Sequence, residues 1–186
     1  MQQQKTSSII IAVLLILIAA ISRVVMYPHN FSPIVGMAVF SGAIIKDKRL
    51  AFALPLFSMF LSDVMFEVFH IAPGFWGWGQ LVGYGIFALI TIIAFSLKKI
   101  SILNVAAYSI LSSVIFFVLS NSSVFVFDNS VYHIYPQSFT GYIDCLYAGL
   151  PFFKTGLLAD QVYSGVLFGA YYLLQQTSTK HKEVIA

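Results

Sequence analysis

The chain has 186 residues, of which 59% are hydrophobic and only 9% are charged. A soluble domain carries roughly 25% charged residues, so this composition excludes an ordinary soluble fold, whose surface it could not cover with polar side chains. The net charge of +3 does not indicate a nucleic-acid-binding protein, because the basic residues lie between apolar runs and form no single stripe. The sequence therefore predicts an all-α integral membrane protein with one transmembrane domain over residues 1–186.

Apolar runs separated by charged or helix-breaking residues predict a bundle of about six transmembrane helices. Ser32 and Pro33 are typical of an N-cap and a first helical position, and residues 46–49 form a charged break. The second helix is short for a full crossing, so partial entry into the bilayer is an alternative for it. The predicted helices cover residues 8–26, 33–45, 50–70, 80–97, 101–120 and 151–176.

Residues 121–149 mix polar and aromatic side chains. We interpret them as a structured loop on the outer side, with a short helix near residues 142–148. Pro151 is expected to start the last transmembrane helix, because proline is favoured in a first turn and disfavoured in a helix interior. Two roles are open for the loop, since it could cover a pocket or only connect two helices.

The positions of lysine and arginine predict the orientation in the membrane. With the N-terminus inside, eight of the ten basic residues fall in cytoplasmic segments, and only Arg23 and Lys154 fall in the outer half. We therefore expect a multi-pass protein of the bacterial inner (cytoplasmic) membrane with both termini in the cytoplasm. The eight inner residues are Lys5, Lys46, Lys48, Arg49, Lys98, Lys99, Lys180 and Lys182.

Most acidic residues and histidines gather in the opposite, outer half of the predicted bundle. A charged side chain at membrane depth is costly unless it is paired or hydrated, so such residues are expected to face the bundle interior or a wet cavity. This distribution predicts a polar pocket that opens to the non-cytoplasmic side. The group consists of Asp63, Glu67, Asp128, Asp144, Asp160, His29, His70 and His133.

The third predicted helix carries the most specific pattern in this group. Asp63, Glu67 and His70 lie at i, i+4 and i+7 and share one helical face. Carboxylates and an imidazole on one stripe are weak candidates for a metal site, a cation site or a proton relay. For Glu67 and His70, contact with water or lipid headgroups is an equal alternative. The deeper Asp63 favours a functional or a buried, paired role.

Two further features concern contacts between predicted helices. Arg23 and Asp160 are interpreted as an ion pair across the bundle, because pairing would lower the desolvation cost of both charges; a role in the site is the alternative. Trp76 and other aromatic residues near the outer face fit an interfacial belt or the stacking walls of a ligand pocket. Small residues with a spacing that lets helices approach closely occur at Ala38, Gly42, Gly165 and Gly169.

Several stretches suggest a family: Tyr27–Ile34 with its Asn-Phe-Ser-Pro segment, Ser41-Gly42-Ala43, Pro55-Leu56, Ser62-Asp63, Phe116-Phe117 with Asn121, and Pro151-Phe152-Phe153 with Asp160. In these stretches the chain resembles a family of bacterial integral membrane proteins of unknown activity that is common in Bacteroidetes. The resemblance spans most of the chain and implies no catalytic residue.

The size, the six predicted spans and the cytoplasmic termini are also similar to the substrate-binding S component of energy-coupling-factor (ECF) vitamin transporters. This resemblance implies a small membrane protein that captures a vitamin or metal from outside, with a separate coupling subunit and two ATPases driving uptake. Many S components carry Ala-x-x-x-Ala on the first helix for contact with the coupling subunit. Ala12, Ala19 and Ala20 lack this spacing, so a solitary S-like transporter is an alternative.

We therefore expect a substrate-binding subunit of a membrane transporter, not an enzyme and without a cofactor, that captures a small vitamin-like solute or a metal from the non-cytoplasmic side. Its expected partners are the lipid bilayer, the solute and an ECF-type coupling subunit with ATPases, because the chain has no P-loop of its own. The alternatives are an intramembrane enzyme using Asp63, Glu67 and His70, and a non-transporting membrane assembly protein. The residues expected to bind the solute are Asn30, Asp63, Glu67, Trp76, Asn121 and Asp160.

Overall fold

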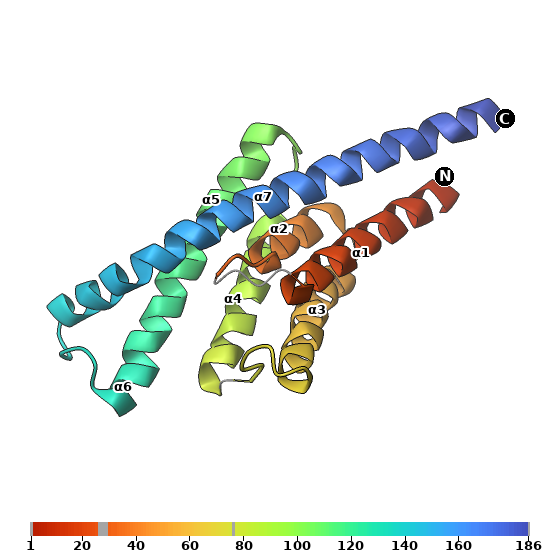
Figure 1. The fold of residues 1–186 in the computed structure, drawn as a ribbon. Helices are drawn as coiled ribbons and strands as arrows, with labels where there is room; N and C mark the ends of the chain where they lie inside the picture. Colours follow the sequence, from red (N-terminus) through yellow and green to blue (C-terminus); the bar gives the residue numbers. More distant parts are fainter. Residues whose placement is uncertain (1, 26–29, 76, 186) are drawn as a thin grey trace.

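The computed structural model describes residues 2–25, 30–75 and 77–185, and every regular element in them is helical (Figure 1). This confirms the all-α class that the sequence predicts. The elements in chain order are α1 (Gln2–Val25), α2 (Ile34–Ile44), α3 (Lys48–Val68), α4 (Trp78–Ala94), α5 (Ile102–Ser123), the π-helix η1 (Val124–Asp128), α6 (Asn129–Tyr132) and α7 (Phe139–Ile185).

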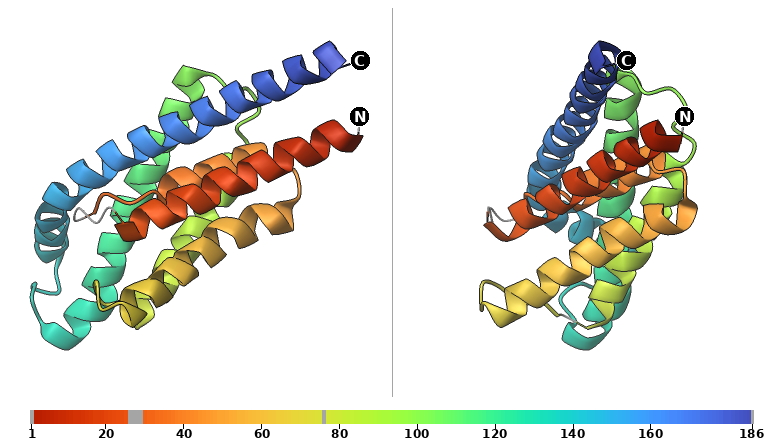
Figure 2. Two further views of the ribbon diagram at one scale, coloured as in Figure 1. Left: turned by 45° about the vertical axis from the view of Figure 1, so that its right-hand side comes forward. Right: turned by 90° about the vertical axis from the view of Figure 1, so that its right-hand side faces the viewer.

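The short helix α2 lies at the centre of the bundle (Figures 1 and 2). It packs against α1, α3, α4, α5 and α7, and every residue from Ile34 to Gly42 is buried. A helix that is hydrophobic all round is typical of such a position. Phe40 is fully buried and meets the rings of Phe168 and Tyr171 on α7 edge-on, with centroids 5.2 and 5.6 Å away.

Gly42 allows α2 to approach α4 closely, which confirms the packing role that its spacing with Ala38 predicts. A Cβ atom at Gly42 would lie 2.5 Å from the carbonyl oxygen of Thr91 and 2.7 Å from the Cβ atom of Ala94. Ala38 is itself fully buried. The contact between these two helices therefore depends on the absence of a side chain at one position.

Replacing Gly42 by alanine should destabilise the protein by about 1–3 kcal/mol, because the added methyl group overpacks the contact with the α4 backbone. Unfolding of the purified protein in detergent measures this effect. Gly165→Ala is the matched control, since no atom lies within 4 Å of an added Cβ at Gly165 or Gly169. These two glycines do not serve packing within the described part of the chain. Equal stability of the two variants would contradict the close α2–α4 contact.

The starts of α2 and α3 differ in their capping. Asp47 caps α3, because its carboxylate accepts hydrogen bonds from the amides of Arg49 and Leu50 at 2.9 and 3.1 Å. At α2 the N-cap residue is Pro33, and no side chain caps the helix. The predicted cap by Ser32 is therefore wrong, because the helix begins one residue later than expected.

Most of the predicted loop at residues 121–149 is helical, so that prediction is wrong. Helix α5 runs on to Ser123 and continues as η1 and α6, and α7 already begins at Phe139. Polar side chains in this stretch bond to their own helix, as where Asn121 Nδ2 donates to the carbonyl of Phe117 at 2.8 Å. Polar residues that bond in this way do not interrupt the helix.

Helix α7 is continuous through Pro151, so the prediction that this proline starts the last helix is wrong. The expected short helix at residues 142–148 is part of α7. Proline removes one backbone hydrogen bond, but proline inside a helix is tolerated in membrane proteins when neighbouring groups satisfy the freed carbonyl. Only residues 133–138 separate α6 from α7.

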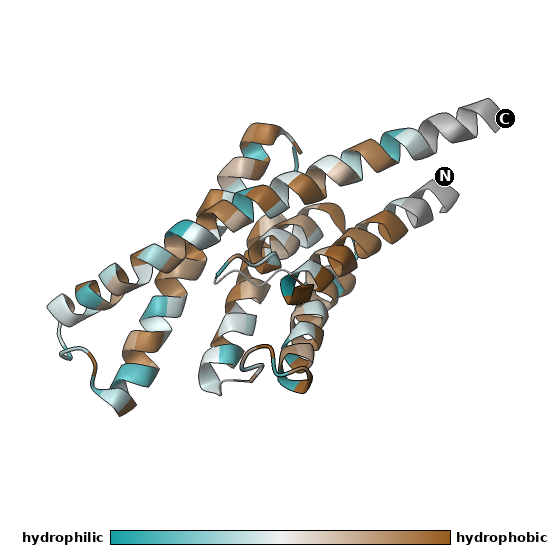
Figure 3. Cartoon of the chain, in the orientation of Figure 1, coloured by the Kyte–Doolittle hydropathy of each residue, from teal (hydrophilic) through white to brown (hydrophobic). Residues whose placement is uncertain are grey.

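Three helical stretches are long and apolar enough to cross a membrane: Ser8–Val25, Lys48–Val68 and Ile102–Tyr132. The helices α2 and α4 are shorter but equally apolar. Many large apolar side chains point outward, such as Ile18 and Ile21 on α1, which are 62% and 58% exposed; Figure 3 shows apolar residues along the outer helices. An outer surface of this kind is typical of contact with lipid. Of the six predicted transmembrane helices, three are therefore long and apolar enough to cross a membrane.

The two ends of the bundle differ in the residues they carry. The connections α2–α3 and α4–α5 lie toward the end where α1 starts and α7 ends, and the connections α3–α4 and α6–α7 lie at the opposite end (Figures 1 and 2). The first end carries exposed basic residues, and the second carries the exposed Glu67, His70 and His133. The exposed basic residues are therefore separated from this second group by the length of the bundle. The basic residues are Lys46, Lys48, Arg49, Lys98 and Lys99.

Candidate functional site

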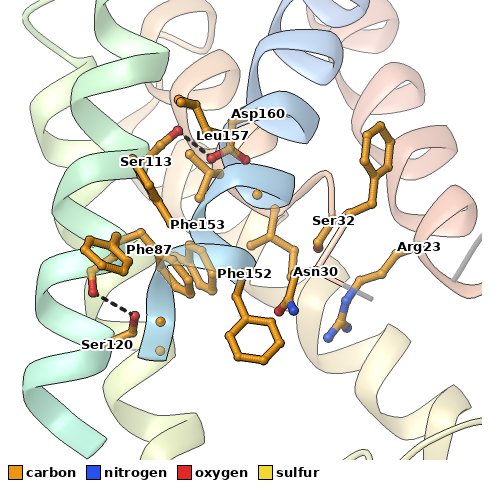
Figure 4. A pocket seen from close by; sticks show the side chains of 18 of the residues that line it. Arg23, Asn30, Ser32, Phe87, Ser113, Ser120, Phe152, Phe153, Leu157 and Asp160 are labelled. Carbon is orange, nitrogen blue, oxygen red and sulfur yellow. Dashed lines mark hydrogen bonds between the residues drawn. The ribbon is translucent and has the colours of Figure 1, made fainter. Parts of the chain in front are cut away.

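A cavity of about 670 Å³ is lined by residues of α1, α3, α4, α5 and α7 and by residues 30–35, which precede and start α2 (Figure 4). This volume is in the range of sites for small organic ligands. Its walls are mainly apolar, and phenylalanine is the most frequent residue among them. The polar residues that line it are Arg23, Asn30, Ser32, Ser113, Ser120, Asn121 and Asp160, and the phenylalanines are Phe31, Phe66, Phe87, Phe116, Phe117, Phe152 and Phe153.

The aromatic walls come from three helices that are distant in sequence. Phe87 of α4 stacks on Phe116 of α5, with centroids 5.2 Å apart and 14° between the ring planes. Phe117 of α5 packs on Phe153 of α7 at 4.7 Å. Such ring pairs are stable and rigid, so they form a preformed apolar surface. A flat organic molecule can stack on such a surface.

The stretch before α2 brings backbone and hydroxyl groups to the cavity. Asn30 adopts the left-handed conformation with φ 61°, which asparagine tolerates better than most residues. The Ser32 Oγ is inaccessible to solvent and has no hydrogen-bond partner within the described chain. This hydroxyl does not cap α2 and is covered by neighbouring protein atoms. Figure 4 shows Asn30, Ser32 and Arg23 at the same side of the cavity.

Asp160 supplies a carboxylate from the middle of α7. It is only 5% exposed, and the hydroxyl of Ser113 on α5 lies 2.6 Å from its Oδ2 atom. The next residue, Gln161, donates from Nε2 to Ser109 Oγ at 2.9 Å. Serines on α5 therefore hold this part of α7, as small polar residues do at helix contacts in membranes.

Asn121 lines the cavity where α5 meets α7. A Cβ atom at Gly149 would lie 2.5 Å from Asn121 Oδ1, so the two helices touch through this pair. The thiol of Cys145 lies 3.6 Å from the carbonyl oxygen of Asn121 and is 2% exposed. This position fits a small buried apolar residue. Asn121, Asn30 and Asp160 are thus brought together around one cavity, as the sequence predicts.

Arg23 pairs with Asp63, and this corrects the predicted Arg23–Asp160 ion pair. Arg23 Nη1 lies 2.6 Å from Asp63 Oδ1 and also donates to Ser62 Oγ. The guanidinium group sits over the ring of Phe66, 4.7 Å from its centroid. The prediction failed because α1 packs directly against α3 at this level, and Asp63 is therefore nearer to Arg23 than Asp160 is.

Asp63 is part of a closed network rather than of the cavity wall. Its Oδ2 atom accepts hydrogen bonds from Gln80 Nε2 and from the Tyr84 hydroxyl, both at 2.9 Å. Its side chain is 1% exposed. The buried, paired role proposed for Asp63 is the one that this geometry supports, because both carboxylate oxygens already have partners from α1 and α4.

The other predicted site residues of this region lie elsewhere. Glu67 is exposed and accepts a hydrogen bond from the amide of Gly74 at 3.0 Å, and His70 is exposed at the end of α3. No group of three histidine, cysteine, aspartate or glutamate side chains in the described ranges could hold a metal ion. The metal site considered for Asp63, Glu67 and His70 is therefore not formed. Trp76, also predicted to bind the solute, lies outside the described residues.

The sequence interpretation missed the phenylalanines of α4, α5 and α7 as cavity residues. The adjacent pairs Phe116-Phe117 and Phe152-Phe153 are a signal for such cavity residues. Consecutive side chains on a helix point about 100° apart, so one member of each pair can turn toward the bundle interior. For Arg23, a role in the site was one of the two alternatives that the sequence left open. Its guanidinium reaches the cavity while Nη1 holds Asp63.

Comparison with known proteins gives a family but no function. No curated protein and no solved structure is significantly similar to the chain. A family of unknown function (DUF6580) matches residues 3–182. Because this match covers nearly the whole sequence, the chain belongs to the DUF6580 family.

Proposed function

We propose that this protein is the solute-binding subunit of a membrane transporter, of the kind represented by ECF S components, and that it captures a small planar, vitamin-like solute from the non-cytoplasmic side. The cavity carries this proposal. It has the size of a small-molecule site, apolar aromatic walls and a few polar groups from α1, α5, α7 and the stretch before α2. That composition favours an organic molecule over a bare metal ion, which would need several converging charged ligands.

The arrangement of the bundle supports an S-component-like topology with cytoplasmic termini. The exposed lysines of the α2–α3 and α4–α5 connections lie toward the end where the chain enters and leaves the bundle. The positive-inside rule places that end in the cytoplasm. The proposed partners are an ECF-type coupling subunit and ATPases. Ala12 and Ala19 are buried in the bundle, so a coupling subunit would have to contact a surface other than these alanines.

A ligand screen tests the proposed function. The purified protein in detergent is heated with a panel of vitamins, related heteroaromatic compounds and divalent metal ions. We expect one planar organic class to raise the unfolding temperature, since a ligand at a hundred times its Kd stabilises the folded state by about 2.7 kcal/mol. Uptake of the same compound into vesicles should depend on this protein. If the sample is folded and no organic compound raises its unfolding temperature, the proposal is overturned.

A further inference from the structure

The charge balance of the cavity singles out Asp160. Arg23 and Asp160 are the charged side chains among the described residues that line it. The charge of Arg23 is already neutralised by Asp63, and these two residues form the one ion pair among the described residues. An ionised Asp160, at 5% exposure, would be a buried negative charge without a counter-ion. Such a state is strongly unfavourable, because a buried charge loses its hydration.

Among the side chains that the structure describes, no charged group besides Arg23 lines the cavity with Asp160. Helix α2 contains no titratable residue, and Tyr108 is the one titratable residue of α5. On α7 the nearest charged residue is Lys154, which is exposed. The described part of α1 contributes Arg23, and Asp128 in η1 is exposed. A counter-charge for Asp160 must therefore be a proton or part of a bound molecule.

The two hydrogen bonds of the Ser113 hydroxyl support the same conclusion. Ser113 Oγ lies 2.6 Å from Asp160 Oδ2 and 2.9 Å from the carbonyl oxygen of Ser109. A hydroxyl has one hydrogen to donate, and a carbonyl and an ionised carboxylate both only accept. A protonated Asp160 removes the conflict, because it donates to Ser113 Oγ and Ser113 donates to the carbonyl.

We propose that Asp160 is protonated in the empty cavity and exchanges this proton for a cationic group of the solute. This inference rests on the proposed solute-binding function and names the class of the solute: a planar organic cation, such as an amidinium or a pyridinium. On binding, the O–H bond of Asp160 breaks, its proton leaves to water, and the carboxylate forms an ion pair with the solute. The phenylalanines around it favour a cationic ring, since aromatic faces attract cations.

The exchange makes binding depend on pH in a defined direction. Because one proton is released for each cation bound, affinity for the cation should rise by about tenfold per pH unit while Asp160 is protonated in the empty protein. A neutral ligand of the same shape should show no such rise. The total charge within the cavity stays the same before and after the exchange.

Infrared spectroscopy and binding measurements on the full chain in detergent test this inference. At neutral pH, the wild type should show the carbonyl stretch of a protonated carboxylic acid, and Asp160→Asn should lack it. The control Asp144→Asn, which changes an exposed position on the same helix, should keep it. Benzamidinium should remove this band, and its affinity should rise with pH. Benzamide, its neutral isostere, should do neither.

Each result decides the inference. If Asp160→Asn leaves the carboxylic-acid spectrum unchanged, Asp160 is not protonated and the inference fails. If benzamide binds as tightly as benzamidinium, or benzamidinium leaves the acid band in place, the exchange is overturned while the cavity remains a solute site. If benzamide, benzamidinium and the whole vitamin panel all fail to bind, the proposed function fails as well.

Discussion

Replacing Arg23 by methionine should destabilise the protein by about 3–5 kcal/mol, because it leaves the carboxylate of Asp63 buried without a cation. Asp63 is 1% exposed and would keep only the hydrogen bonds from Gln80 and Tyr84. Those neutral donors do not replace a positive charge. The measurement is the free energy of unfolding in mixed detergent micelles.

Two further variants make the Arg23 result specific. Lys154→Met removes a charge of the same sign from an exposed position on α7 and should change stability by less than about 1 kcal/mol. The double variant Arg23→Met, Asp63→Leu removes both charges and should recover part of the lost stability. A single Arg23→Met variant that is as stable as Lys154→Met would show that the pair does not hold α1 to α3.

Replacing Gly156 by phenylalanine should fill the cavity and abolish ligand binding. Gly156 lines the cavity, and the nearest atom to an added Cβ is the carbonyl oxygen of Asn30 at 3.9 Å. A side chain at this position therefore enters empty space and leaves helix packing intact. Binding of the compound found in the screen should weaken by about a hundredfold or more, which corresponds to about 2.7 kcal/mol.

Gly165→Phe is the matched control for the blocked cavity. Gly165 lies on the same helix, and an added Cβ there also meets no atom within 4 Å, but the residue does not line the cavity. This variant should bind the compound as wild type does. If Gly156→Phe folds and binds with unchanged affinity, the compound occupies another site and the cavity is not the binding site.

Features that depend on the local sequence were predicted correctly. The composition alone requires a large outward apolar surface, and the long apolar runs became α1, α3 and α5. The charged break at residues 46–49 separates α2 from α3 and supplies the α3 cap. The bounds of α2, α3 and α4 differ from the predicted ones by a few residues, because fraying and capping depend on single side chains. Asn30, Asn121 and Asp160, which were chosen from their type and their expected position in the outer half, all line the cavity.

The contacts between distant helices could be seen only in the tertiary structure. By charge alone, Arg23 can pair with either of two acids, Asp63 or Asp160. The packing of α1 on α3 places Asp63 beside Arg23 and so decides between them. Likewise, local rules predict that Pro151 starts a helix, yet α7 continues through it. A sequence pattern records which residues are apolar or charged along one helix, whereas partners depend on distances between helices. Those distances, rather than any local pattern, leave Asp160 without a cation beside an aromatic cavity.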